Sequence, residues 1–209
     1  MAIDNLGETR LFEYGEMQIN HLKKADKKLG EAIDRIGKIE RVVTPDLFIA
    51  LVHSVVNQQI SLKAAATVFS RLQGKLGEIS PNSVMAHTVE ELRECGLSAR
   101  KVGYIRGIAE KIINGELNLE ELKNMSDEEV IKKLSSLDGI GRWTAEMLLI
   151  FSMERPDIVS WGDVGIRRGM CRLYGLKELT REQFDKYRAR YSPYGSVASL
   201  YLWKIAHEG

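Results

Sequence analysis

Hydrophobic side chains recur at every third or fourth position along most of the chain, which is the spacing of one face of an α-helix. No segment alternates hydrophobic and polar residues as a half-buried strand does. The pattern therefore predicts an all-α fold, with a central helix over 47–56 because that segment is apolar on nearly every side. Predicted helices cover residues 17–36, 47–56, 62–76, 99–114, 127–134, 142–151, 164–174, 181–190 and a last segment ending at 207.

Helix-capping residues stand immediately before most of these segments. Thr88 and Ser126 each precede a glutamate by three positions, which is the pattern of a capping box. Gly96 and Gly115 stand where helices end, because glycine accepts the left-handed backbone that closes a helix. The other predicted caps are Thr44, Ser61, Ser80, Ser98, Thr180 and Ser192.

Composition excludes several classes of protein. Apolar residues make up 44% of the 209 positions, which suffices for a folded core, and only two cysteines are present. Two cysteines cannot build a disulfide framework, a zinc site or a four-cysteine iron–sulfur cluster on their own. The first residues lack the apolar run of a secretion signal and no apolar stretch is long enough for a membrane span, so we expect a cytoplasmic protein with no membrane partner. The formal net charge of +1 neither favours nor excludes nucleic acid.

The segment 136–145 has the most specific pattern, SLDGIGRWTA. One helix ends, Gly139 and Gly141 turn the chain, and a new helix begins at Arg142. Glycine allows φ above zero and close approach to a phosphate, while exposed N–H groups at a helix N-terminus favour an anion. This pattern is typical of a helix–hairpin–helix that grips the DNA backbone without reading sequence. An ordinary corner between two helices is the alternative.

Asp163 follows at the start of the helix over 164–174, where an aspartate most often serves only as a cap. Taken with the hairpin, however, the segment 158–168, IVSWGDVGIRR, resembles the helix–hairpin–helix, Gly/Pro-rich, invariant-Asp superfamily of DNA glycosylases. The two motifs are similar to those of its bacterial 3-methyladenine DNA glycosylase II members. Asp138 replaces the proline of the usual L-P-G-x-G motif, which weakens the rigidity of the turn but keeps both glycines.

Three further segments carry the same resemblance, NQQIS at 57–61, GLSARK at 96–101 and YSPYGSVA at 191–198. The similarity runs over residues 40–207 and implies a two-lobed helical fold with an active-site cleft between the lobes and no N-terminal β-rich domain. The implied parts are lobe A over about 44–134, the hairpin over 135–145, and lobe B over about 146–209 together with 1–43.

The resemblance implies a chemical role for Asp163. A DNA glycosylase extracts its target nucleotide from the duplex, and cleavage of the N-glycosidic bond builds positive charge on the sugar. A carboxylate beside the sugar stabilises that charge and orients or deprotonates water. Bifunctional relatives carry a lysine two residues after the second hairpin glycine, where this chain has Trp143. Because an indole cannot form a Schiff base, we expect a monofunctional enzyme that leaves an abasic site.

The resemblance also implies aromatic walls for the base pocket. Trp143 and Tyr194 match such positions, and an electron-rich ring attracts the positive charge of an alkylated purine. Trp161 is a further candidate wall, and Met147 occupies a place that is often aromatic in the family. Packing in the core is the alternative for each aromatic residue, and it is the role that we expect for Trp203.

DNA contacts are expected from two loops and from the hairpin. Gln59 matches the family position that wedges into the duplex after base flipping. Alternatively, Gln58 and Gln59 satisfy buried backbone groups between two helices. Arg100 and Lys101 begin a helix, where a phosphate contact and a surface ion pair both remain open. The other candidates for DNA contact are Gly139, Gly141, Arg142 and Thr144.

Members of the resembled family often bind a monovalent cation (Na⁺ or K⁺) through hairpin carbonyls, which here belong to Ser135, Leu137 and Ile140. No other cofactor and no iron–sulfur cluster is implied. The expected partner is double-stranded DNA with damaged bases, bound by a monomer that is nucleoid-associated in a prokaryote. A glycosylase for uracil or hypoxanthine and a non-catalytic helix–hairpin–helix DNA-binding module are the alternatives.

Overall fold

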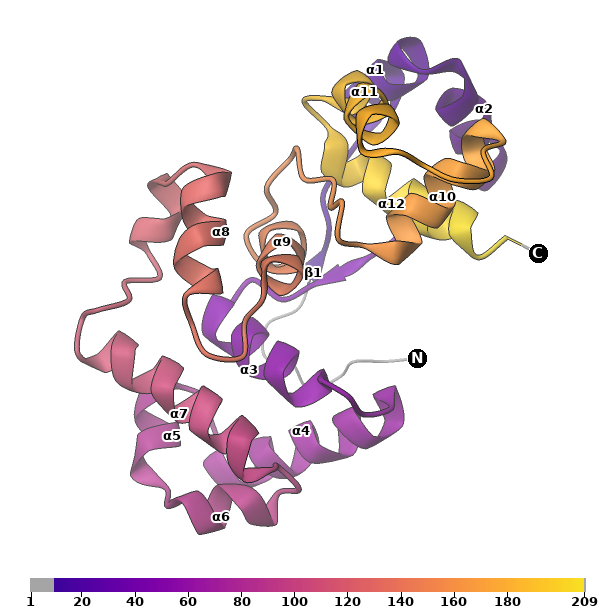
Figure 1. Ribbon diagram of the computed structural model, residues 1–209. Coiled ribbons are helices and arrows are strands. Elements are labelled where there is room, and N and C mark those ends of the chain that lie inside the picture. Colours follow the sequence, from indigo (N-terminus) through magenta and orange to yellow (C-terminus); the bar gives the residue numbers. More distant parts are fainter. Residues whose placement is uncertain (1–9, 209) are drawn as a thin grey trace. The chain divides into compact units, whose positions relative to one another are not determined.

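The computed structural model describes residues 10–208 (Figure 1). Within them, two paired strands of two residues each, β1 (Arg10–Leu11) and β2 (Val42–Val43), accompany twelve α-helices and the short 3-10 helix η1 (Glu121–Asn124), so the prediction of an all-α fold is confirmed. The helices are α1 (Glu16–Ala25), α2 (Lys27–Ile36), α3 (Leu47–Asn57), α4 (Leu62–Leu76), α5 (Pro81–Ala86), α6 (Val89–Glu94), α7 (Ala99–Ile113), α8 (Asp127–Ser135), α9 (Arg142–Phe151), α10 (Val164–Tyr174), α11 (Arg181–Tyr191) and α12 (Gly195–Ala206).

The chain forms two compact units, and each is described by itself. Unit 1 consists of Met1–Arg10 and Thr44–Leu148, and unit 2 of Leu11–Val43 and Leu149–Gly209. The first nine residues and Gly209 lie outside the described part. None of the helices over 10–208 is both long enough and apolar enough to cross a membrane.

Unit 1 is built around α3 and α7. Helix α3 packs against α4 and α7, and α7 also packs against α5 and α6 (Figure 1). Leu51, Val52 and Val55 of α3 have no exposed surface, which agrees with the prediction that this helix is central. Burial of apolar side chains on several sides of one helix supplies most of the stability of such a unit.

Unit 2 is built around α12, which is buried along nearly all of its length. It packs against α2, α10 and α11. Gly169 allows the closest approach, because a Cβ at this position of α10 would lie 2.7 Å from the carbonyl carbon of Leu202 in α12. This close packing fixes α10, and therefore its first residues, relative to α12.

Most predicted helix starts are confirmed, including the N-caps Ser61, Ser80, Thr88, Ser98, Ser126 and Thr180. Two predictions near the N-terminus were wrong. The single helix over 17–36 is in fact two helices, because Asp26 leaves the helical conformation and caps α2 by accepting the N–H of Leu29. The cap of α3 is Asp46, not Thr44, because the Asp46 side chain accepts the N–H of Ile49.

The last helix also begins later than predicted. Its first residue is Gly195, not the Ser192–Pro193 pair. The carboxylate of Asp157 accepts hydrogen bonds from the Ser192 hydroxyl and from the Gly195 N–H, so a residue distant in sequence caps this helix.

Candidate active site

The hairpin of unit 1 connects α8 to α9 through residues 136–141. Gly139 has a φ of +83°, which L side chains rarely adopt, and a Cβ there would lie 2.8 Å from Cε2 of Tyr104. The turn is closed by a 3.0 Å hydrogen bond from the Ile140 N–H to the Leu137 carbonyl. Gly139 is therefore required by the conformation and packing of the turn.

Gly141 differs from Gly139, although both were expected to serve the same purpose. Its φ is not positive, and a Cβ built on it would meet no atom within 4 Å. The residue is exposed directly before the first turn of α9. The open space at the N-terminus of a helix suits the approach of an anion to the backbone N–H groups.

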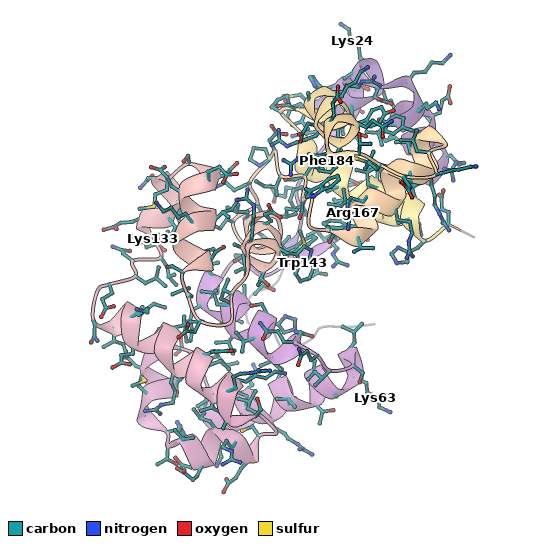
Figure 2. The ribbon with its side chains drawn as sticks, viewed as in Figure 1. Lys24, Lys63, Lys133, Trp143, Arg167 and Phe184 are labelled. Carbon is teal, nitrogen blue, oxygen red and sulfur yellow. The ribbon has the colours of Figure 1, made fainter. Side chains whose placement is uncertain are left out.

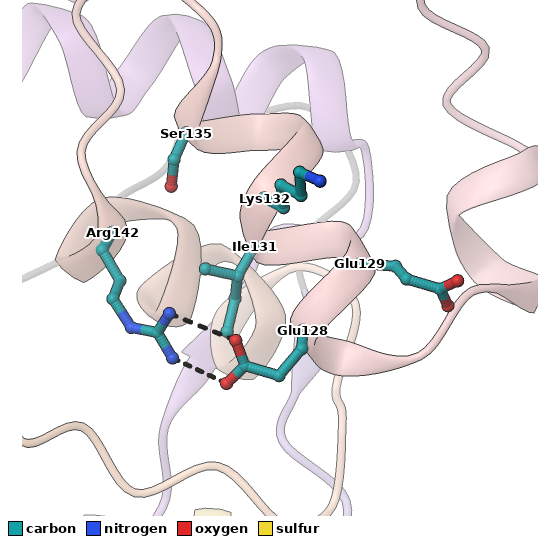
Figure 3. Close-up of a pocket in the computed structure, with 6 residues that line it drawn as sticks. All are labelled: Glu128, Glu129, Ile131, Lys132, Ser135 and Arg142. Carbon is teal, nitrogen blue, oxygen red and sulfur yellow. Dashed lines mark hydrogen bonds and ion pairs between the residues drawn. The ribbon is translucent and has the colours of Figure 1, made fainter.

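Arg142, the first residue of α9, has carboxylate partners. Its guanidinium makes two hydrogen bonds to Glu128, of 2.6 and 3.1 Å (Figure 3). A third hydrogen bond, of 3.0 Å, joins it to Glu146. The hydrogen bond to Glu128 raises the pKa of Arg142. A DNA contact by Arg142 therefore requires a phosphate to compete with Glu128. The pair lies at a pocket of about 480 Å³ lined by Glu128, Glu129, Ile131, Lys132, Ser135 and Arg142.

The next residues of α9 include the predicted base-contacting side chains of unit 1. Trp143 keeps half of its surface exposed (Figure 2), which is unusual for a tryptophan and contradicts packing in the core as its role. Met147 lies one turn further along the helix and is half-buried, as is Thr144. Trp143 thus presents an aromatic surface beside the hairpin.

The loop after α3 places Gln58 and Gln59 differently. Gln58 donates a 2.7 Å hydrogen bond from Nε2 to the Gly139 carbonyl, whereas Gln59 is exposed with a φ of +56°. The expectation that these residues satisfy buried backbone groups is therefore met by Gln58, and Gln59 remains available for another role.

Arg100 and Lys101 also have different environments. Arg100 is exposed at the start of α7, but the ammonium of Lys101 donates a 2.8 Å hydrogen bond to the Val56 carbonyl at the end of α3. Burial, and secondarily the charge of Arg100, lowers the pKa of Lys101. Lys101 therefore binds the backbone of its own protein, and Arg100 is the more exposed cation of the two.

Asp163 is a buried carboxylate of unit 2. Only 7% of the residue is exposed, and its Oδ1 accepts the Ile166 N–H at 2.8 Å and the Trp203 indole N–H at 2.9 Å. It is the N-cap of α10, so it lies at the positive end of the helix dipole. A carboxylate held in one orientation by two donors is suited to stabilise positive charge.

Trp203 was expected only in the core, and its contact with Asp163 was not predicted. It is half-buried on α12, and its ring lies 5.4 Å from that of Phe151 at the end of α9. The guanidinium carbon of Arg41 lies 4.9 Å from the centre of the Phe151 ring. A buried indole needs an acceptor for its N–H, but nothing in the local sequence identifies that acceptor as Asp163.

Trp161 and Tyr194 have neighbours of their own in unit 2. The Trp161 ring packs edge-on against Phe184, and the guanidinium carbons of Arg167 and Arg181 lie 5.1 and 5.4 Å from its centre. Tyr194 is the N-cap of α12 and packs edge-on against the ring of His21. Two cations already contact Trp161, so its environment does not favour a cationic base.

Oxygen donors for a cation are present at the hairpin. Ser135 is the last residue of α8, where helix carbonyls lack intrahelical partners, and its buried hydroxyl has no hydrogen-bond partner. The Leu137 carbonyl accepts the Ile140 N–H and keeps its second lone pair. Among the described residues, no cluster of three or more His, Cys, Asp or Glu side chains is arranged to hold a metal ion.

Comparisons with known proteins agree on one family. Residues 52–193 match the model of the HhH-GPD superfamily of base excision DNA repair proteins. DNA-3-methyladenine glycosylase 1 of Schizosaccharomyces pombe is 32% identical over 196 residues, which cover 91% of this chain and 86% of that protein. A putative DNA-3-methyladenine glycosylase of Bacillus subtilis is 28% identical over 97% of this chain and 80% of its own length.

Solved structures of similar proteins share the fold. The structure of DNA-3-methyladenine glycosidase from Bacillus halodurans aligns with a TM-score of 0.86 at 37% identity, over 95% of this chain and 93% of that one. The 3-methyladenine DNA glycosylase of S. pombe, solved in complex with abasic DNA, aligns with a TM-score of 0.77 at 33% identity, over 90% and 96% of the two chains.

Proposed function

The chain belongs to the HhH-GPD superfamily of base excision DNA repair proteins, and on this premise we propose that it is a DNA glycosylase for alkylated bases of the 3-methyladenine type. The membership confirms the resemblance drawn from the hairpin and the Asp163 segment. The reaction is hydrolysis of the N-glycosidic bond of a base flipped out of double-stranded DNA, and the product is an abasic site.

The observation that carries the proposal is the environment of Asp163. Its carboxylate is buried, caps a helix and is oriented by the N–H groups of Ile166 and Trp203. In the reaction, the ionised carboxylate stabilises the positive charge that develops on the sugar as the bond to the base breaks. It also orients the water whose oxygen bonds to the sugar carbon and takes up the proton that this water loses, while the cationic alkylated base leaves as a neutral molecule with the electron pair of the broken bond.

Recognition of DNA is assigned to unit 1. The N–H groups at the N-terminus of α9 and the open space at Gly141 support binding of a phosphate by the hairpin. Backbone donors and one helix dipole supply this attraction to the phosphate. DNA binding therefore does not require a net charge of the whole chain above its value of +1. We assign Gln59 to the gap left in the duplex and Trp143 to stacking on the alkylated base.

Trp143 also supports a monofunctional reaction. It occupies the position where strand-cutting members of the family carry a lysine, and an indole cannot form a Schiff base with the sugar. We therefore expect no covalent adduct when the protein is treated with borohydride on DNA containing an abasic site. Strand cleavage without alkali, or a trapped adduct, contradicts this part of the proposal.

We also propose that the carbonyl oxygens of Ser135, Leu137 and Ile140 hold a monovalent cation, since carbonyl groups can replace its hydration shell. When bound, it would add positive charge beside the phosphate held by the hairpin. We expect DNA affinity at constant ionic strength to be higher in potassium or sodium chloride than in tetramethylammonium chloride. Equal affinity in the three salts argues against a cation at these carbonyls.

The decisive experiment measures base release. Duplexes containing 3-methyladenine, 7-methylguanine, uracil or hypoxanthine are incubated with the protein, and free base and alkali-labile sites are quantified. We expect release of the alkylated purines, abolished in Asp163→Asn and retained in Asp185→Asn, which removes an exposed carboxylate of α11. Release of uracil or hypoxanthine alone changes the substrate, while DNA binding without any base release indicates a non-catalytic module.

A further inference from the structure

Gln59 has a backbone conformation that its surroundings must maintain. Its φ of +56° lies in the left-handed region, and the residue is exposed at the tip of the loop between α3 and α4 together with Ile60. A residue with a side chain loses about 1 kcal/mol or more in this region relative to the right-handed one. Such a conformation persists where neighbouring groups fix the flanking residues, and two contacts do so here.

The first contact joins this loop to the hairpin. Gln58 directly precedes Gln59, and its side-chain amide donates a 2.7 Å hydrogen bond to the Gly139 carbonyl, 81 positions away in sequence. Gly139 is itself fixed by its φ of +83° and by the ring of Tyr104, as described above. The backbone before Gln59 is therefore tied to the rigid turn that we assign to phosphate binding.

The second contact fixes the end of α3. This helix ends at Asn57, so the Val56 carbonyl is one of the last four that lack a partner within the helix. Lys101 supplies the partner through a 2.8 Å hydrogen bond from its partly buried ammonium. Lys101 and Tyr104 are three positions apart on α7 and therefore share a face of that helix. One helix thus supports both the end of α3 and the hairpin turn.

We infer that Gln58 and Lys101 are positioning residues that hold Gln59 in register with the phosphate-binding hairpin, so that gripping the strand and filling the gap in the duplex are carried out by one rigid body. The inference rests on the proposed function, which assigns Gln59 to that gap. It gives Lys101 a role different from the phosphate contact expected from its place at a helix start.

The test compares two substrates that differ in the need to open a base pair. One contains the alkylated purine in a fully paired duplex, and the other places it opposite a one-nucleotide gap, where no partner base has to be replaced. Gln58→Met and Lys101→Met each remove the donor while keeping a long side chain. Gln73→Met on α4 and Lys111→Met on α7 are the matched controls, and Lys101→Arg is the conservative variant.

We expect the single-turnover rate of base release from the paired duplex to fall about tenfold in Gln58→Met and Lys101→Met, since small misplacements of positioning groups have effects of this size or larger. The rate on the gapped substrate stays within about twofold of the wild type, and the controls and Lys101→Arg behave as the wild type on both substrates. If Gln58→Met does not fold, Gln58→Glu replaces it, since a carboxylate cannot donate to the Gly139 carbonyl.

An equal fall on both substrates, or no fall on the paired duplex, overturns the inference and leaves the proposed function intact. A wild-type protein that releases no base from either substrate overturns the proposed function first, and the inference with it.

Discussion

The indole N–H of Trp203 donates a 2.9 Å hydrogen bond to Oδ1 of Asp163, across 40 positions of the chain. Trp203 lies on α12 and Asp163 caps α10, two helices that pack closely at Gly169. A hydrogen bond to a charged group contributes about 1.5–3 kcal/mol, and here it also selects one orientation of the carboxylate. The last helix therefore takes part in forming the candidate catalytic group.

Replacing Trp203 with phenylalanine removes the donor and keeps an aromatic ring. We expect the single-turnover rate of base release to fall about tenfold, because the carboxylate loses its fixed orientation, while affinity for abasic DNA changes by less than about twofold. Trp161→Phe is the control, since the Trp161 ring packs against Phe184 in the same unit. An unchanged rate in Trp203→Phe, or an equal loss in the control, contradicts the orienting role.

Replacing each hairpin glycine with alanine should affect a different property, the stability of the fold at Gly139 and the affinity for DNA at Gly141. Gly139→Ala introduces a Cβ at a φ of +83° and against the Tyr104 ring, so we expect a loss of at least about 2 kcal/mol in the free energy of unfolding. Gly141→Ala meets no atom of the protein and leaves that energy within about 0.5 kcal/mol. Its methyl group instead occupies the approach to the helix N-terminus, so DNA affinity falls.

Urea denaturation and DNA titration of the two alanine variants measure these quantities separately. Equal stability of both variants argues against a strained turn at Gly139. Undiminished DNA affinity of Gly141→Ala argues against a phosphate at the start of α9.

Glu128 competes with DNA for the guanidinium of Arg142. Both side chains are mostly exposed, at 73% and 59%, so the pair contributes less than about 1 kcal/mol to stability. We expect Glu128→Gln to tighten DNA binding up to about fivefold and to steepen its dependence on salt, because Arg142 loses one of its two carboxylate partners and becomes more available to a phosphate. Equilibrium titrations at several salt concentrations measure both effects.

Glu129→Gln is the control for this prediction. It makes the same change of charge on the same helix, and glutamine preserves the capping box with Ser126. A similar gain in affinity from both variants points to net charge alone, and a gain that persists when Arg142 is also replaced excludes Arg142 as its cause.

Predictions from the sequence succeeded where cause and effect lie within a few positions. The capping boxes of Thr88 and Ser126 depend on the residue three positions later, and both are present. The hairpin and Asp163 were found because a short motif with a known role contains them. The break at Asp26 was missed, because helical periodicity continues across it and only the aspartate marks the cap.

Contacts between distant segments could not be predicted from a single sequence. Tertiary packing sets three hydrogen bonds of this kind, which Trp203 donates to Asp163, Gln58 to Gly139 and Lys101 to Val56. Each of the three donors could equally have an ordinary local role, in the core or on a helix surface. The sequence pattern alone does not distinguish that local role from the long-range hydrogen bond. The pairing of Arg142 with Glu128 was missed for the same reason.

Asp26 connects three helices of unit 2 and should be important for stability. Only 2% of its side chain is exposed, and its Oδ2 accepts hydrogen bonds from the Tyr174 hydroxyl at 2.7 Å and from Arg190 at 2.9 Å. Asp26→Asn weakens these charge-assisted bonds, so we expect a loss of about 2 kcal/mol in the free energy of unfolding, measured in urea. Asp34→Asn removes an exposed carboxylate of α2 and should cost much less; equal losses would contradict the importance of the buried group.

His53 should make the stability of the protein dependent on pH. Its ring packs edge-on against Phe69 in unit 1, and burial lowers its pKa below the ordinary value of 6.5. The unfolded chain therefore binds a proton more readily than the folded one, so the contribution of His53 to stability is present above about pH 6.5 and is lost as the pH falls below that value.

We expect His53→Gln to be less stable than the wild type at pH 7.5, and the difference to shrink at pH 5.5. Urea denaturation at both values measures the two differences, with His207→Gln at the exposed end of the chain as control. A difference that is constant or grows toward acid pH would contradict the lowered pKa of His53.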